Sequence, residues 1–444
     1  MHHRISSHTA GLLFAPGLVL LAAAFVQAQG AKESDPLANV SMEELEKDMG
    51  KYRSKYNDLF RGTTSLEAGD QEQVNAIDTA ARYTLYRFYD SRIQKPGPRD
   101  ISIDRVFQEF EDMQLKEILK NKEKNTGVAQ LFTKKVIEHA KLVLQTPRPK
   151  GPIAHVNAAH VLERLTKLGQ PELADALLEI LNQQLQYDAA PAEWKRNDGV
   201  KLYVLRGLGE MLALQDQNPP GLNNGQEQKI ILALVQFIER KTEPLLGKGA
   251  PAEEIDGWRA LRREAVRALA NGRLAALPNN DKTQPGLLLL RVMARDGVTP
   301  EPRMDERLEA AIGVARLSPE RTKTYQQEYA AYQLGLFVDA LAGYAGQAKE
   351  EQKPMKVYAA RLLDALDGMR TPTNKDTVGK IVNETYRLLR PLETSGTTVD
   401  LATQRNTYGQ WMTTNLPKKD SLFEGVKDAT VKPANRPEDE APEK

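Results

Sequence analysis

The strongest constraint on the fold is a regular alternation that runs from Pro152 to Leu416. Segments of about 12–25 residues, with apolar residues at helical spacing, are separated by short stretches rich in Pro, Gly and Asn. No run of alternating β-branched residues lies between them, although a mixed fold would need short Val- and Ile-rich strands there. We therefore predict an all-α protein. The separating stretches are Gln217–Gly225, Leu245–Pro251, Pro278–Gly286 and Thr371–Asn374.

Residues 41–146 show the same pattern and predict a helical bundle at the N-terminal side. Ser41, followed three residues later by Glu44, is a capping-box signal for a helix that ends near Phe60. Apolar periodicity predicts three further helices in this region. They cover Val74–Phe88, Asp104–Lys122 and Val128–Gln145.

Two segments of the longer region share an internal pattern. The first is small and apolar over Val156–Leu165, turns at Gly169-Gln170-Pro171, and returns with spaced apolar residues over Ala174–Leu181. The second lies within 256–269. Both resemble a HEAT repeat of the short bacterial type, whose second helix carries an Asp, a Val-Arg pair and spaced alanines before a Leu. The residues that match are Asp256, Leu261, Arg262, Ala265, Ala268 and Leu269, with Leu261 in place of the usual Val.

This resemblance covers residues 152–317 and extends weakly to 366. It implies a HEAT- or armadillo-like α-solenoid, in which residues 152–416 form a superhelix of antiparallel helix pairs. The repeat anchors are about 44, 61 and 47 residues apart, near the ~40–47 of such repeats except for one insertion. Small residues at the packing positions let neighbouring helix axes approach closely. The anchors are Val156, Val200, Leu261 and Leu308.

The N-terminal segment has the features of a secretory signal. Arg4 precedes an apolar run over Gly11–Val26, and Ala28 closes a small-residue cleavage site. We expect cleavage after Ala28, followed by a flexible tether over 29–40, and a periplasmic or extracellular location. The alternative is a retained membrane anchor, but the run is shorter than the ~20 apolar residues that span a bilayer and contains Pro16.

Composition narrows the classes of function. The chain has no cysteine, so its stability in an oxidising compartment must come from the apolar core. Lys and Arg number 61 against 60 Asp and Glu, and this balance argues against a nucleic-acid partner. Aromatic residues make up only 6% of the chain, which argues against a carbohydrate-binding cleft, because such clefts use several stacked aromatic side chains. Beyond Leu416 apolar periodicity is lost, and we predict a disordered charged tail over 417–444.

Arg259, Arg263 and Arg267 form a ladder at i, i+4 and i+8 on one predicted helix. Such a ladder of guanidinium groups is a candidate site for an acidic partner segment. The alternative is a solvated face, or pairing with nearby acids such as Glu264.

Tyr325, Tyr329 and Tyr332 follow i, i+4 and i+7, so they are predicted to share one helical face. Exposed, they would be candidate anchors for a bound peptide. The alternative is burial between helices. Tyr83, Tyr86 and Tyr89 present the same two possibilities.

Metal and catalytic motifs are weak in this chain. His155 and His160 are five residues apart, so on a helix they point about 140° from each other and do not share a metal. The stretch Asp216–Glu227 has oxygens at several EF-hand positions, but Pro220 occupies a ligand position, which favours a plain turn over calcium. We find neither a nucleophile elbow nor a phosphate-binding loop, and expect no cofactor.

These features together predict an exported, non-enzymatic interaction or scaffold protein that presents a helical-repeat surface to a protein or an extended peptide. We expect no nucleic-acid partner, and no stable membrane insertion once the signal is cleaved. The alternative is an envelope enzyme that acts on a polysaccharide. That alternative requires a closed α/α toroid with acidic residues in an aromatic cleft.

Overall fold

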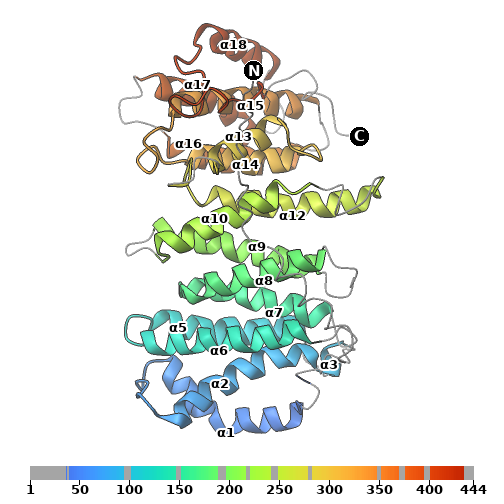
Figure 1. The fold of residues 1–444 in the computed structure, drawn as a ribbon, viewed down its shortest axis with the longest axis vertical. Coiled ribbons are helices and arrows are strands. Elements are labelled where there is room, and N and C mark those ends of the chain that lie inside the picture. The colour runs from blue at the N-terminus through green and yellow to red at the C-terminus, as the bar shows by residue number, and fades with distance from the viewer. Residues whose placement is uncertain are drawn as a thin grey trace, which may run out of the picture.

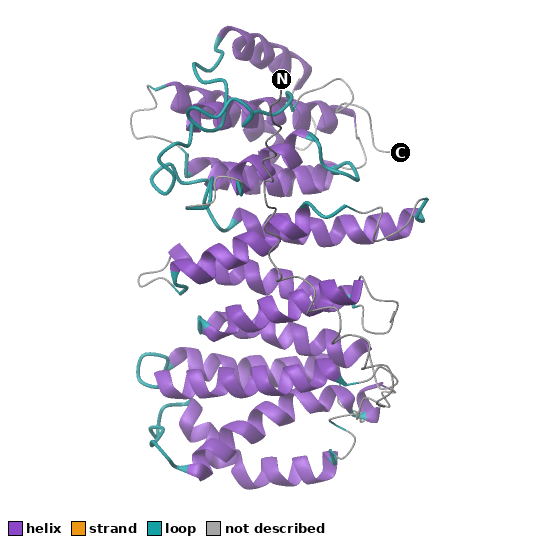
Figure 2. Ribbon diagram, viewed as in Figure 1, coloured by secondary structure: helices purple, strands orange, loops and turns teal. Residues whose placement is uncertain are grey.

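The structure, a computed structural model, is helical throughout the part of the chain that it describes (Figure 2). It describes residue 37 and residues 40–94, 102–146, 152–188, 197–216, 221–241, 249–278, 283–347, 352–369, 376–394 and 401–434. The predicted signal segment and most of the predicted tether lie outside these ranges. Within them, extended chain is confined to isolated bridges, such as the one between Tyr325 and Phe423. The all-α prediction is confirmed.

The N-terminal helices begin and end close to the predicted positions. Ser41 is the N-cap of α1, and its hydroxyl accepts a hydrogen bond from the Glu44 amide. The predicted third helix contains a π-helical turn, η2, between α4 and α5. The helices of this part are α1 (Met42–Phe60), α2 (Gln71–Tyr86), α3 (Ser91–Gln94), α4 (Ile103–Glu109), η2 (Phe110–Leu115), α5 (Lys116–Lys120) and α6 (Thr126–Gln145).

The remaining helices alternate between two layers. In one layer α7, α9, α12, α14 and α16 pack successively on one another, and in the other α8, α10, α13 and α15 cover them. The helices are α7 (Pro152–Leu165), α8 (Glu172–Asp188), α9 (Asp198–Ala213), α10 (Asn224–Ile238), α12 (Ala252–Ala270), α13 (Pro285–Ala294), α14 (Met304–Arg316), α15 (Gln327–Gln347), α16 (Gln352–Asp367), α17 (Thr377–Thr394) and α18 (Leu401–Thr414).

The stack is open and elongated. Figure 1 shows α1 at one end of the long axis and α18 at the other, with the remaining helices stacked between them. Because α6 packs directly on α7, the predicted bundle and the predicted repeat region share one continuous core. The arrangement is compatible with a helical-repeat fold. The described helices do not close into the ring that a toroidal enzyme requires.

Small residues set the spacing between helices in the first layer. A Cβ added to Gly209 in α9 would lie 2.9 Å from the Cα of Ala268 in α12. One added to Gly313 in α14 would lie 3.1 Å from the Cα of Ala270. Larger side chains at these glycines would push the axes apart, which is the role predicted for small residues in this pattern.

The prediction of a disordered tail from residue 417 is wrong for residues 417–434. Leu422 and Phe423 are buried, and the backbone of this segment exchanges hydrogen bonds with the stretch before α15 through Gln326 N to Leu422 O and Glu424 N to Thr324 O. Helical periodicity could not predict the order of this segment, because the segment is extended and its hydrogen-bond partners lie elsewhere in the chain. Residues 435–444 lie outside the described ranges.

None of the described helices is long and apolar enough to cross a bilayer.

Candidate functional site

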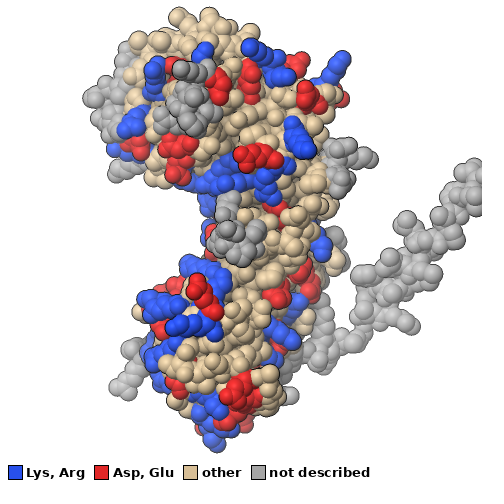
Figure 3. Space-filling view, turned by 90° about the vertical axis from the view of Figure 1, so that its left-hand side faces the viewer, with Lys and Arg blue, Asp and Glu red and all other residues tan. Residues whose placement is uncertain are grey.

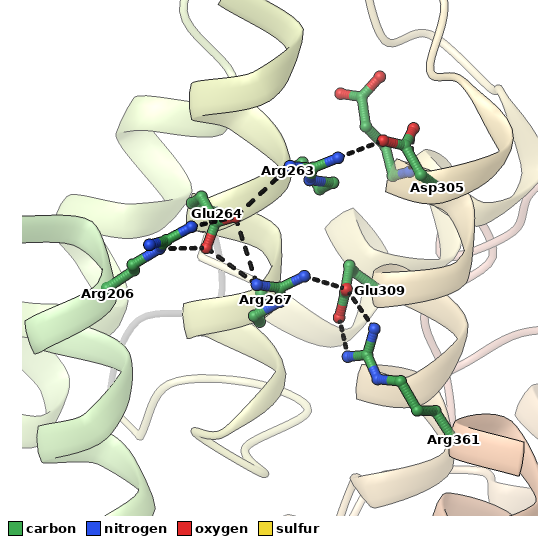
Figure 4. Close-up of polar contacts among 8 residues, drawn as sticks. Arg206, Arg263, Glu264, Arg267, Asp305, Glu309 and Arg361 are labelled. Atoms are coloured by element: carbon green, nitrogen blue, oxygen red, sulfur yellow. Dashed lines mark hydrogen bonds and ion pairs between the residues drawn. The ribbon is translucent and has the colours of Figure 1, made fainter. Parts of the chain in front are cut away.

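The arginines of α12 lie between two other helices of the same layer. Their side chains reach acids of α12 itself and of α14, and arginines from α9 and α16 join them (Figure 4). We call this group the arginine ladder. Its members are Arg206, Arg263, Glu264, Arg267, Asp305, Glu309 and Arg361.

Glu264 is the first shared acid of the ladder. Its side chain is 0% exposed and accepts hydrogen bonds from Arg206 Nε and Arg267 Nη1, each at 3.1 Å. Arg263 Nη2 lies 3.7 Å from the same carboxylate. A single buried charge therefore holds guanidinium groups from two helices.

Glu309 is the second shared acid. Its side chain is 3% exposed, and it receives Arg267 Nη2 and both terminal nitrogens of Arg361, all at 2.7 Å. Burial alone would raise the pKa of Glu309, but the hydrogen bonds from Arg361 and Arg267 outweigh it and lower that pKa. Arg267 thus bridges Glu264 and Glu309, while Arg263 pairs with Asp305 at 2.6 Å.

The ladder presents positive charge to solvent. Its four arginine side chains are 33–40% exposed, whereas the two shared carboxylates lie beneath them. Four arginines face three acids in this group, and two further acids, Glu163 and Glu210, share a recess with Arg206 and Arg267. Nearby, burial and then the cations Arg273 and Arg361 lower the pKa of Arg316, while Asp364 opposes them.

The molecule is hollowed on one side at the height of α9 and α12. Figure 3 shows this hollow and the Lys and Arg side chains gathered at its borders. Between α9 and α12 a small recess of about 120 Å³ is lined by ladder residues and by acids of α7 and α9. The lining includes Glu163, Arg206, Glu210, Glu264 and Arg267.

His160 joins this surface to the N-terminal helices. Its ring lies between Phe107 and Tyr203, with centroid distances of 4.3 and 4.2 Å. Burial, followed by the nearby Arg164 and Arg206, lowers its pKa to about 4. Its Nε2 accepts a hydrogen bond from Arg164 Nε, which fits a neutral imidazole.

The structure separates the three arginines predicted from the sequence. Arg263 and Arg267 belong to the ladder, but Arg259 pairs with Asp256 and donates to the carbonyl of Glu301 toward the other end of α12. Sequence reasoning missed Arg206 and Arg361, which lie on other helices. One signal was present: each follows an apolar residue, as Arg262 follows Leu261 in the repeat pattern.

The tyrosine row is mostly core. Tyr325 lies before the first residue of α15 and is buried, so it does not share a helical face with the other two. Tyr329 is also buried, and its hydroxyl accepts a hydrogen bond from the Val431 amide. Tyr332 is half-buried. Tyr325 and Tyr329 therefore cannot anchor a partner, because the C-terminal segment packs over this region.

Glu227, the last candidate ligand of the EF-hand-like stretch, has another role: its carboxylate accepts two hydrogen bonds from Arg321 Nη2. Asn223 of the same stretch caps α10. Residues 217–220 of that stretch lie outside the described ranges. His155 binds the carbonyl of Thr146. Over the described ranges, His, Asp and Glu form no cluster of three with metal-binding geometry.

No family model, curated protein or solved structure matches this chain.

Proposed function

We propose that this chain is an exported, non-enzymatic interaction protein whose arginine ladder binds an acidic, extended segment of a partner protein. The observation that supports the proposal is the sharing of two buried carboxylates by four half-exposed guanidinium groups across α9, α12, α14 and α16.

Shared buried acids prepare the arginines for binding. Each guanidinium is held by a fixed carboxylate, so less side-chain entropy is lost when a partner carboxylate arrives. An arginine that gives some of its five donors to the buried acid keeps others for a ligand. The row extends over several helices, which suits an extended chain better than a small molecule.

Charge also favours a peptide over a nucleic acid. The whole chain carries a formal net charge of +1, and acids alternate with arginines along the ladder. A continuous phosphate backbone would meet these acids at regular intervals, whereas a peptide can place acidic side chains selectively. The enzyme alternative depended on a closed toroid, and we do not propose it for an open stack.

The binding test uses a variant that leaves every buried acid paired. In Arg206→Gln/Arg361→Gln, both Glu264 and Glu309 keep Arg267. We expect a fluorescent Glu- and Asp-rich peptide to bind the full chain in a salt-dependent way, and the double variant to bind at least about tenfold more weakly.

The matched control, Lys116→Gln/Arg387→Gln, removes the same charge from exposed positions on α5 and α17, outside the ladder. It should bind within about twofold of the parent. Equal weakening in both variants would show that only net charge matters and would contradict the proposal. In the native cell envelope, crosslinks to a partner should map to α9, α12, α14 and α16.

Export is tested separately. The N-terminus of the protein recovered from the cell envelope should be Gln29, as expected for cleavage after Ala28. Recovery with an intact N-terminus in the membrane fraction would support the anchor alternative instead.

A further inference from the structure

A second candidate site lies at the N-terminal end of the stack. A cavity of about 300 Å³ opens between α1, α2, α4 and η2, which is at the small end of the range for ligand pockets. Its lining combines tyrosine rings, methionines and charged groups. The lining includes Met49, Arg53, Tyr56, Tyr83, Arg87, Glu109, Met113 and Gln114.

Local backbone features keep this space open. The π-helical turn η2 interrupts the helix that carries Glu109 and Gln114, a feature that is common at functional sites. On the opposite wall Gly50 sits inside α1, and a Cβ added there would meet no atom within 4 Å. Without a side chain at residue 50, α1 leaves the mouth of the cavity unfilled.

One wall of the cavity is fixed by paired charges. Arg87 is buried, donates to Glu109 through Nη1 and to the carbonyl of Tyr83 through Nε, and lies 4.3 Å above the Tyr83 ring. Arg105 Nε binds the other oxygen of Glu109 at 3.1 Å. Glu46 pairs with Arg92. Both lining acids are therefore already neutralised.

Several donors around the same space have no acceptor among the described residues. Tyr56 is only 3% exposed, yet its hydroxyl makes no hydrogen bond there. The Tyr83 hydroxyl, the guanidinium of the exposed Arg53 and the side-chain nitrogen of Gln114 likewise have no acceptor among those residues. Burial raises the pKa of Tyr56, so its hydroxyl stays protonated and can donate at neutral pH.

We propose that this cavity binds a small organic carboxylate with an apolar or aromatic body. Its carboxylate would accept from Arg53 and the Tyr56 hydroxyl, and its body would lie against Met49, Met113 and the tyrosine rings. A cationic ligand would meet the unpaired Arg53, and a neutral apolar ligand would cover the Tyr56 hydroxyl without giving it a hydrogen-bond partner. The lining has a single unpaired arginine, which matches one negative charge rather than two.

The test titrates phenylacetate into the full chain and follows binding by calorimetry. Phenylacetamide, of the same shape but neutral, and phenethylamine, which is cationic, serve as comparison probes. We expect phenylacetate to bind at least about tenfold more tightly than either, because charge-assisted hydrogen bonds to a partly buried carboxylate are the strong ones. Equal affinities for the three probes, or no binding by phenylacetate, would overturn the proposal.

Variants locate the site. Arg53→Gln and Tyr56→Phe should each weaken phenylacetate binding by about tenfold. Lys51→Gln is the control, because it removes a positive charge from another face of α1. Gly50→Leu should abolish binding by filling the mouth while it removes no polar group. Helicity and the melting temperature are compared first, so that loss of folding is not read as loss of binding.

This site is independent of the arginine ladder. The Arg206→Gln/Arg361→Gln variant should bind phenylacetate as the parent does, and Gly50→Leu should still bind the acidic peptide. Binding of phenylacetate that survives both Arg53→Gln and Gly50→Leu would place it elsewhere on the molecule and refute the assignment.

Discussion

The arginine ladder and the N-terminal cavity both contain a carboxylate that several arginines share. They differ in whether these arginines end at the surface or line a cavity. In both, one carboxylate is shared by arginines from different elements: Glu264 and Glu309 in the ladder, Glu109 in the cavity. In the ladder the arginines end at the surface. In the cavity they form the wall of a space that also holds hydroxyl and guanidinium donors with no described partner.

The difference comes from backbone spacing rather than from charge. Gly209 lets α9 lie directly against Ala268 of α12, so only the small recess of about 120 Å³ remains between these helices, and arginines lie at its edge. Around the cavity, Gly50 faces empty space and η2 bulges the opposite wall. A glycine therefore closes one interface and leaves the other open.

The largest expected effect contrasts the two kinds of shared acid. Glu264→Ala removes a fully buried carboxylate and leaves Arg206 and Arg267 without it, so we expect a loss of about 3 kcal/mol in the free energy of unfolding. Glu109 is 30% exposed, but its partner Arg87 is buried and would keep only the Tyr83 carbonyl as an acceptor, so Glu109→Ala should cost about 2–3 kcal/mol. Chemical denaturation measures both. A loss below about 1 kcal/mol for either variant would show that its arginines do not depend on that carboxylate.

A pH effect is expected where the two regions meet, at His160. Its folded-state pKa of about 4 lies below the ordinary 6.5, so the unfolded chain binds the proton more readily. Stability is then complete above pH 6.5 and falls by about 2–3 kcal/mol as the pH drops toward 4. Denaturation of the parent and of His160→Phe at several pH values measures this. If the free energy of unfolding depended on pH in the same way in both proteins, His160 would be ruled out as the source of the effect.

A smaller effect is expected at the closed interface. Gly209→Ala would place a methyl group 2.9 Å from the Cα of Ala268, and we expect it to destabilise the protein by about 1–3 kcal/mol. It should also weaken binding of the acidic peptide, since α9 carries Arg206. An unchanged free energy of unfolding would mean that α9 and α12 can move apart without loss of stability.

The smallest effect has the opposite sign. The methyl group added by Gly50→Ala would meet no atom within 4 Å, and residue 50 lies inside a helix. The substitution should therefore stabilise the protein by about 0.5–1 kcal/mol. The melting temperature should rise while phenylacetate still binds, because a methyl group does not fill the mouth as Leu does. A destabilised Gly50→Ala protein would argue against open space at this position.

Local features of the fold were predictable from the sequence. The N-cap at Ser41, the helix that ends at Phe60 and the small residues around Ala268 all follow from interactions within a few turns of one helix or from its packing stripe. The sequence also pointed to Arg263 and Arg267 as neighbours, since i and i+4 fix their common face.

The partners of those arginines could not be predicted in this way. Arg267 meets Glu309 from 42 residues away, Arg206 meets Glu264 from 58, and Arg361 meets Glu309 from 52. Such pairs depend on the rotation of each helix in the stack. The burial of Tyr329 and the docking of Leu422 depend in the same way on an extended segment with no periodicity of its own.

The sequence by itself determined that this chain is all-α, where most helices begin and which of their faces are small and apolar, because these properties depend on spacing of 3.6 residues per turn. Only the tertiary structure decided which charges are buried, which arginines reach solvent and where a cavity remains. The reason is that burial and ion pairing depend on distances between helices, which residues far apart in the chain set together.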